Sequence, residues 1–212
     1  MRILSAMILG SALAAACATS SADQIIHYKL DPWHTQVRFT WQHVGFSSPG
    51  ADFTDVTGTI DGNQDHPELS TVNVVIPVKS LDTYVPALNE HLIDSGDFFK
   101  TQKFPTITFK STGMDHINKD ARTFDLHGVL TVNGIAKDVV LHAHANKIGA
   151  HPFYNNAPAA GFDASTTLKR SDFGMSAYVP MVSDDLDVHI TVEAIEASAY
   201  DKKMAEMAAK KK

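Results

Sequence analysis

A strict alternation of apolar and polar residues over the segment 105–112 constrains the fold of this chain more than any other feature. On an extended backbone the apolar Ile107 and Phe109 fall on one face, opposite Thr106, Thr108 and Lys110. Because side chains alternate between the two faces of a strand, this pattern is typical of an antiparallel strand with one buried face. The same pattern recurs along most of the chain, so we expect a sheet that closes around apolar contents.

Strand patterns and turn residues divide the chain into short elements. Nine segments alternate in this way: 24–30, 35–44, 55–61, 71–80, 105–112, 123–132, 137–147, 161–169 and 186–197. Asn133-Gly134 is typical of a tight hairpin, because both residues tolerate a positive φ. One short helix is expected over 86–95, with Pro86 near its start and Gly96 just past its end. The segments 46–52 and 150–160 are rich in Gly, Pro, Ser and Asn and are predicted to be loops.

Eight or nine long antiparallel strands form either a sandwich or a closed barrel. Sequential hairpins with few crossovers favour closure. The sequence therefore predicts an all-β fold: an extended eight-stranded antiparallel up-and-down β-barrel with one short helix. A barrel of this size is just wide enough to be filled by its own side chains or to hold one slender ligand. Both interpretations of the inward aromatic residues stay open, and the pattern alone favours the filled core.

The first 22 residues have the pattern of an export signal. Arg2 precedes an uncharged apolar run over 3–16, and small residues follow. We expect a signal peptide over 1–22, a barrel domain over 23–197 and a Lys/Ala-rich tail over 198–212 that is either frayed helix or disordered. A second processing route stays open, in which a lipoprotein-like box ends in an acylated Cys17. Either route predicts an exported protein.

Charge and cysteine content exclude several classes of partner and site. The formal net charge is −6, and no basic stripe precedes the C-terminal tail, which argues against binding to nucleic acid. The lysine-rich tail leaves open a weak electrostatic contact with a membrane surface. Cys17 is the only cysteine, so the folded part has neither a disulfide nor a cysteine metal site.

A long hydrocarbon tail suits the interior of a slender barrel. A ten-residue strand spans about 33 Å. Each buried methylene contributes about 0.8 kcal/mol, so a tail of about 16 carbons offers about 13 kcal/mol before the cost of ordering it. Such a site needs almost no polar groups and selects for the length and thickness of the chain.

Short motifs along the chain carry a family resemblance. They include Asp31-Pro32-Trp33-His34, His43-Val44-Gly45-Phe46, Ser95-Gly96-Asp97-Phe98-Phe99, Phe104-Pro105-Thr106-Ile107-Thr108-Phe109, the segment 160–175 and Ser183-Asp184-Asp185. In their order, from about Ile26 to Glu196, they resemble the YceI-like family of periplasmic polyisoprenoid-binding proteins. The resemblance implies a lipocalin-like barrel with a lipid-filled pore, often as a homodimer. It also implies ligands such as long isoprenoid chains, quinone tails or fatty amides.

The expected ligand-binding residues fall into three groups. The tail would be buried among Phe39, Trp41, Phe109, Phe124, Leu130, Leu141, Phe162 and Val188. Phe46, Phe98, Phe99 and Phe173 would form a flexible apolar rim near the opening. His43 and Arg170 are the headgroup candidates; the structural alternatives are a His43 bound to a loop carbonyl and an Arg170 paired with Asp172.

Few polar residues suggest catalysis. His142 and His144 share an outward strand face and could begin a zinc site, but zinc needs three or four ligands and the spacing identifies no third. The chain has no glycine-rich phosphate loop and no nucleophile elbow. The predicted function is non-enzymatic binding, transport or storage of a long-chain amphiphilic lipid of the polyisoprenoid type, with no catalytic residue, metal or cofactor beyond a bound isoprenoid or quinone-like lipid. Two alternatives stay open: an accessory that holds a quinone for a membrane cytochrome, and a metal-assisted enzyme that uses the same cavity.

Overall fold

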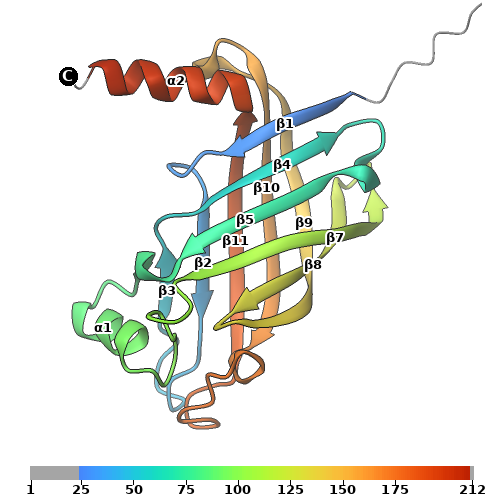
Figure 1. The fold of residues 1–212 in the computed structure, drawn as a ribbon. Coiled ribbons are helices and arrows are strands. Elements are labelled where there is room, and N and C mark those ends of the chain that lie inside the picture. The colour runs from blue at the N-terminus through green and yellow to red at the C-terminus, as the bar shows by residue number, and fades with distance from the viewer. Residues whose placement is uncertain (1–23, 211–212) are drawn as a thin grey trace, which may run out of the picture.

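Eleven strands form one antiparallel sheet that closes on itself, with a helix at each end (Figure 1). The structure is a computed structural model and describes residues 24–210. The predicted signal segment 1–22, including Cys17, lies outside the described residues. The strands are β1 (Ile25–Leu30), β2 (Gln36–Thr40), β3 (Gly50–Phe53), β4 (Thr57–Asn63), β5 (Thr71–Pro77), β6 (Leu81–Asp82), β7 (Thr106–Asn118), β8 (Thr123–Val132), β9 (Ile135–His151), β10 (Ala157–Lys169) and β11 (Asp185–Glu196); the helices are α1 (Pro86–Asp94) and α2 (Ala197–Lys210).

Three of the long strands are interrupted. β1 and β2 both pair with β11, since Leu30 lies opposite Ala194 and Gln36 lies opposite Thr191. In the next interrupted strand, β3 pairs with β2 and β4 pairs with β1. In the third, β6 pairs with β3 and β5 pairs with β4. The closed ring runs β1-β4-β5-β7-β8-β9-β10-β11 and returns to β1. The predicted eight-stranded up-and-down barrel is therefore confirmed.

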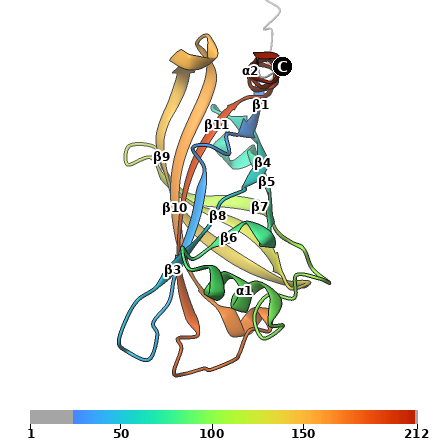
Figure 2. The same cartoon turned by 90° about the vertical axis from the view of Figure 1, so that its left-hand side faces the viewer.

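The hairpin between β8 and β9 has the turn that its residues predict. Asn133 and Gly134 have φ values of 53° and 74°, and only residues that tolerate this region suit such a turn. The predicted helix over 86–95 is also confirmed, because α1 starts at Pro86 and Gly96 follows its end with a φ of 75°. Figure 2 shows α1 below the barrel, at the end where the loops 41–49 and 170–184 lie.

The C-terminal tail differs from the expectation of a single short helix. Residues 197–210 form α2, which follows β11 directly and runs outward from the upper end of that strand (Figure 1). The Lys29 Nζ atom contacts Asp201 Oδ1 at 2.6 Å, so an ion pair ties this helix to β1. The fold therefore has two α-helices, and the helical alternative for the tail is the one that the structure shows.

The predicted loops also contain strand. Residues 50–53 form β3, and β9 and β10 extend through most of 150–160 as a ribbon that rises above the barrel in Figure 2. Ala157 still pairs with His151 near the tip of this ribbon. Pairing with a neighbouring strand overrides the loop preference of Gly, Pro and Asn, because strand formation depends on its partners more than on local propensity.

Candidate functional site

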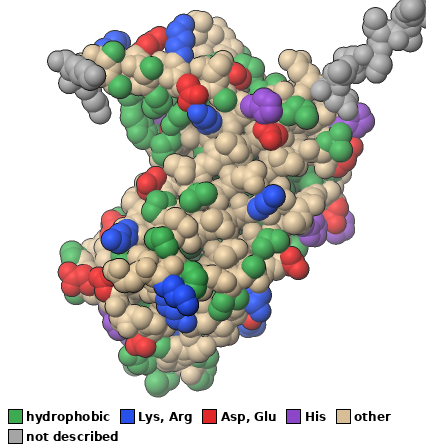
Figure 3. Space-filling model, in the orientation of Figure 1, with side chains coloured by type: hydrophobic (Ala, Val, Ile, Leu, Met, Phe, Trp, Pro, Cys, Tyr) green, Lys and Arg blue, Asp and Glu red, His purple; other side chains and the backbone are tan. Residues whose placement is uncertain are grey.

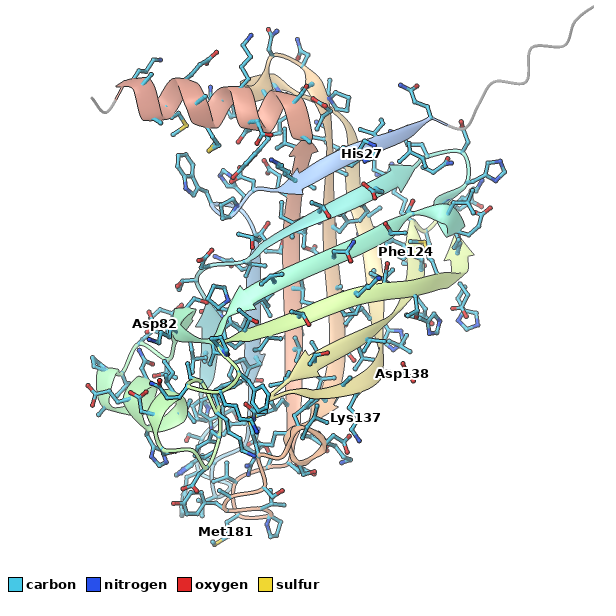
Figure 4. All side chains as sticks on the ribbon, in the orientation of Figure 1. His27, Asp82, Phe124, Lys137, Asp138 and Met181 are labelled. Atoms are coloured by element: carbon cyan, nitrogen blue, oxygen red, sulfur yellow. The ribbon has the colours of Figure 1, made fainter. Side chains whose placement is uncertain are left out.

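A cavity of about 730 Å³ runs through the interior of the barrel. Its wall consists of the inward side chains of successive strands, such as Val72, Val74 and Ile76 on β5. Phe124 of β8, labelled in Figure 4, is another of these lining residues. The volume is in the range of ordinary small-molecule sites, and it excludes the interpretation of a barrel filled solid by its own side chains.

Most of the predicted tail-binding residues line this cavity. Seven of the eight do so: Phe39, Phe109, Phe124, Leu130, Leu141, Phe162 and Val188. The exception is Trp41, which lines a second, smaller pocket. The alternation of each strand placed these side chains inside, and their contact with a ligand stays a prediction.

The barrel end next to α1 is closed by aromatic packing. The rings of Phe53 and Phe99 meet edge to face with centroids 6.1 Å apart, and Phe173 is only 3% exposed. Met175 is buried beside them. The expectation that Phe99 and Phe173 belong to a flexible rim is therefore wrong, because both are packed into the base of the cavity.

A second apolar pocket of about 360 Å³ lies beyond this base. It is lined by Trp41, His43, Phe98 and Arg170, among others, and by Met181 at the lower tip of the molecule (Figure 4). Four side chains line both spaces and form the wall between them: Phe39, Phe99, Met175 and Leu186.

Phe46 was also expected at the rim and lines neither space. It lies on the exposed loop between β2 and β3 with 91% of its surface exposed. Of the predicted rim, only Phe98 borders a pocket without being buried, and that pocket is the second one.

Arg170 is a structural residue in this fold. It is 3% exposed, and its guanidinium donates to the carbonyl oxygens of Ser183, Met175 and Val182 at 2.8, 2.6 and 2.9 Å. Burial lowers the pKa of the guanidinium, although the group keeps its three acceptors. Arg170 therefore holds the loop 171–184 in place. Its predicted partner Asp172 lies instead 3.8 Å from Lys137 Nζ.

His43 likewise lies away from the open end of the cavity. Its backbone N–H donates to the carbonyl of Ser47 at 2.8 Å, and it forms an isolated bridge with Val182. These contacts place it at the closed end, beside the second pocket. Neither predicted headgroup residue lines the main cavity.

The exposed residues of the cavity lining lie at the β4–β5 and β7–β8 turns and near the end of β9, away from α1 in Figure 1. The cavity therefore opens to solvent at this end. Its charged lining residues are Lys119, Arg122 and Lys147, and the amides Asn63, Gln64 and Asn118 accompany them. We call these six residues the basic mouth. Arg122 donates to the carbonyl of Asn146 at 3.2 Å, which holds the β7–β8 turn against β9.

Sequence reasoning missed the basic mouth because its cations come from two separate elements. Lys119 and Arg122 lie in a turn, and Lys147 lies near the end of a strand. Lys147 continues the two-residue spacing of Leu141, Ala143 and Ala145, which all face inward. This spacing is the one signal in the sequence that could have indicated its inward position.

The described lining of the main cavity carries no histidine and no carboxylate. All its charged residues are cations, in a chain whose net charge is −6. Tyr28 lines the wall, and its burial raises the pKa of the phenol, so the group stays neutral. The lining can therefore surround an apolar chain and attract an anionic end, and it contains no acid–base pair.

The motif residues Asp31 and His34 form a structural clasp between β1 and β2. Asp31 is buried; its carboxylate accepts from the backbone N–H of Trp33 at 3.0 Å and lies 2.9 Å from His34 Nδ1. The hydroxyl of Tyr154 donates to the same carboxylate at 3.2 Å. These bonds fix the interruption of the strand.

Within residues 24–210, no helix has both the length and the apolar character needed to cross a bilayer.

Comparisons with known proteins agree on one family. The model of the YceI-like domain matches residues 28–194. A UPF0312 protein of Azotobacter vinelandii is 35% identical over 194 residues, which cover 92% of this chain and 97% of that protein. The solved YCEI protein of Campylobacter jejuni is 30% identical with a TM-score of 0.65, over 73% of this chain and 89% of that chain.

A more distant solved structure has the same fold. A polyisoprenoid-binding domain from Saccharophagus degradans superposes with a TM-score of 0.57 at 11% identity, over 82% of this chain and 99% of that domain. Together with the closed barrel and its apolar cavity, the match over most of the described residues leads to one conclusion: this chain belongs to the YceI-like family.

Proposed function

We propose that this protein binds the hydrocarbon tail of a long-chain amphiphilic lipid of the polyisoprenoid type, and that it carries or stores the lipid without catalysing a reaction on it. The observation that carries the proposal is the cavity of about 730 Å³, which is apolar along its length and charged only at its open end. The polyisoprenoid-binding domain of the same fold supports the choice of ligand class.

The headgroup is assigned to the basic mouth in place of His43 and Arg170. A tail inside the cavity leaves its polar end beside Lys119, Arg122 and Lys147, where no lining carboxylate competes. The nearby Glu68 is not part of the lining; it contacts His66 at 3.1 Å and also interacts electrostatically with Lys119. A phosphate or another anionic headgroup therefore suits this end better than a neutral one.

The export signal predicted for residues 1–22 supports a periplasmic location. A protein in that compartment has access to lipids of two membranes, so carriage or storage is a useful activity there. A homodimer and a contact with a membrane surface stay predictions.

A single space-filling substitution tests the cavity. Ala143 is buried on the inward face of β9, and both of its cross-strand neighbours, Phe124 and Ala164, line the cavity. In Ala143→Phe the added ring occupies tail space, so we expect affinity for a polyprenol to fall about tenfold or more, because overpacking costs about 1–3 kcal/mol. Displacement of a fluorescent apolar probe measures this affinity.

The matched control is Ala136→Phe, which places the same side chain on the exposed outward face of β9. It should bind polyprenol as the unchanged protein does. A folded Ala143→Phe variant with undiminished affinity would contradict tail binding in the barrel.

A pair of ligands tests the headgroup assignment. Removing two mouth charges in Arg122→Gln/Lys147→Gln should weaken binding of a polyprenyl phosphate by about 3- to 10-fold, since exposed charge pairs contribute up to about 1 kcal/mol each. Binding of the polyprenol with the same tail should not change. An equal loss of affinity for both ligands would contradict the assignment of the headgroup to the basic mouth, but it would not contradict tail binding.

A further inference from the structure

A β-bulge in β7 turns two consecutive residues to the outside of the barrel. Met114 and Ile117 both line the cavity, and the pairing of β7 with β8 shifts register between Asp115 and Asn118. His116 has a φ of 48°, a left-handed value that a bulge can require and that most residues avoid. Regular alternation would turn His116 inward; instead Asp115 and His116 share the outer face.

This outer face aligns ligand-type side chains across three strands. Asp115 on β7 lies directly opposite Asp125 on β8, and Asp125 lies directly opposite His142 on β9. Like charges in directly opposite positions destabilise a sheet unless something neutralises them. In Figure 3, histidine and acidic side chains gather at the right-hand edge of the molecule, where β7 and β8 meet in Figure 1.

Only histidines neutralise the two carboxylates within residues 24–210. His116 Nδ1 lies 2.9 Å from Asp125 Oδ2 and 3.2 Å from Asp115 Oδ1. His142 Nδ1 lies 2.7 Å from Asp125 Oδ1. No lysine or arginine of the described chain forms an ion pair with either aspartate.

A fifth residue adds an observation of a different kind. His127 Nε2 is itself buried, although the side chain is 38% exposed, and it lies 2.9 Å from Asp115 Oδ1 in an ion-pair contact that does not have the geometry of a hydrogen bond. Its position beside Asp115 suits a residue that orients the carboxylate when that carboxylate turns toward a cation.

We propose that Asp115, His116, Asp125 and His142 bind a divalent transition-metal ion of the zinc type, with His127 as the residue that positions Asp115. The ligand atoms of Asp115, His116 and Asp125 lie within 4.8 Å of one another. Tetrahedral zinc with bonds of about 2.0–2.1 Å keeps its ligands about 3.3 Å apart, so the close contacts need to open by only a few tenths of an ångström.

The mixture of ligands selects the class of ion. Imidazole suits zinc, copper and nickel, whereas magnesium and calcium bind through oxygen alone. The side chains of His116 and His142 are 78% and 68% exposed, so an ion reaches them from solvent and His142 can adjust its rotamer. The bound ion joins β7, β8 and β9 just below the basic mouth, because Lys119 is three residues from His116.

The proposed site assigns different roles to His142 and His144, the two histidines that the sequence suggested as the start of a zinc site. The two histidines share a face, but His144 Nδ1 lies 2.9 Å from Asn146 Oδ1 and takes no part in the cluster. The other proposed ligands of the ion lie on the neighbouring strands β7 and β8. The spacing of residues along β9 alone therefore cannot reveal them.

Calorimetric titration of the full, untagged protein with zinc chloride tests the proposal. We expect one zinc ion per chain with micromolar or tighter affinity, a rise of the melting temperature by several degrees, and no response to magnesium. Failure to bind zinc, or an equal response to magnesium, overturns the proposal. Lipid binding is measured separately and does not decide either outcome.

Two variants and a control locate the ion. Asp125→Asn preserves shape and removes the shared carboxylate, and His116→Ala removes an imidazole; both should weaken zinc binding at least tenfold. His144→Ala should bind as the unchanged protein does, which separates this site from general binding by surface histidines. Circular dichroism without metal verifies that each variant is folded. Undiminished zinc binding by folded Asp125→Asn overturns the proposal.

Discussion

At the scale of single residues, the missing side chain of Gly128 makes room for an aromatic ring in the cavity wall. A Cβ atom at this position would lie 2.3 Å from Phe109 Cζ and 2.8 Å from the carbonyl oxygen of Lys110. The ring could move, but the backbone oxygen is fixed in the pairing of β7 with β8. The alternation of the sequence places Phe109 and Gly128 inside the barrel correctly, but their contact needs the register of two strands.

We therefore expect Gly128→Ala to destabilise the protein by about 1–3 kcal/mol, the usual cost of overpacking. Urea denaturation measures the free energy of unfolding. Gly113→Ala is the control, because a Cβ atom there meets nothing within 4 Å. Equal stability of the two variants would contradict the close packing of Phe109 on Gly128.

Asp52 shows a second residue-scale feature that the sequence did not reveal. It is 6% exposed, and Arg38 holds its two oxygens with Nε–Oδ1 and Nη2–Oδ2 distances of 2.9 and 2.7 Å; Tyr84 donates a further hydrogen bond. The Arg38 hydrogen bond lowers the pKa of the Asp52 carboxyl below its ordinary value of 3.8. Asp52 lies in a segment predicted to be a loop, so no pairing with Arg38 could be foreseen.

The sign of the resulting pH dependence follows from linkage. Because the folded pKa is below the unfolded one, the contribution of Asp52 to stability is fully present above pH 3.8 and is lost as the pH falls through the folded pKa. Asp52→Asn should cost about 1–2 kcal/mol at pH 7 and much less at low pH. Urea denaturation of both proteins between pH 7 and pH 3 measures the difference; a constant difference would contradict this role.

At the scale of secondary structure, hydrophobic alternation was sufficient to find the long strands and their inward faces, and proline and glycine located α1. The interruption at 31–35 falls between two predicted segments, 24–30 and 35–44. The interruption at 78–80 was not predicted, because it lies inside the predicted strand 71–80, and the one at 54–56 was not recognised, because β3 was predicted to be a loop. Both depend on where a strand changes its partner. The bulge at Asp115 and His116 was missed for a related reason. It adds one residue to a strand without a proline or an additional glycine to mark it.

The helix α2 was only one of two expectations for the tail, because its lysines and alanines fit an isolated, frayed segment equally well. None of its residues is buried, and the Lys29–Asp201 ion pair is exposed. Exposed pairs of this kind contribute up to about 1 kcal/mol.

A chain that ends at Ala197 should therefore lose no more than about 2 kcal/mol and keep its lipid affinity, as the predicted domain boundary requires. Thermal unfolding and probe displacement measure the two quantities. A truncated chain that does not fold would show that the barrel domain extends into α2.

At the scale of the whole molecule, the sequence could not distinguish a hollow barrel from a filled one. Inward aromatic and aliphatic residues give the same alternation in both cases, and the free volume depends on how the rings stack across the axis. The basic mouth depends on the same geometry, because turns from different hairpins meet only when the sheet closes. The family resemblance favoured a lipid-filled pore, and the cavity agrees with that expectation.

The most direct measurement is organic extraction of untagged protein isolated from its own cells, followed by mass spectrometry. We expect close to one long-chain lipid per folded chain, with an isoprenoid tail and an anionic headgroup; a quinone would instead favour the redox accessory. Protein that carries no lipid, and that takes up neither polyprenol nor polyprenyl phosphate when these are supplied, would contradict the account.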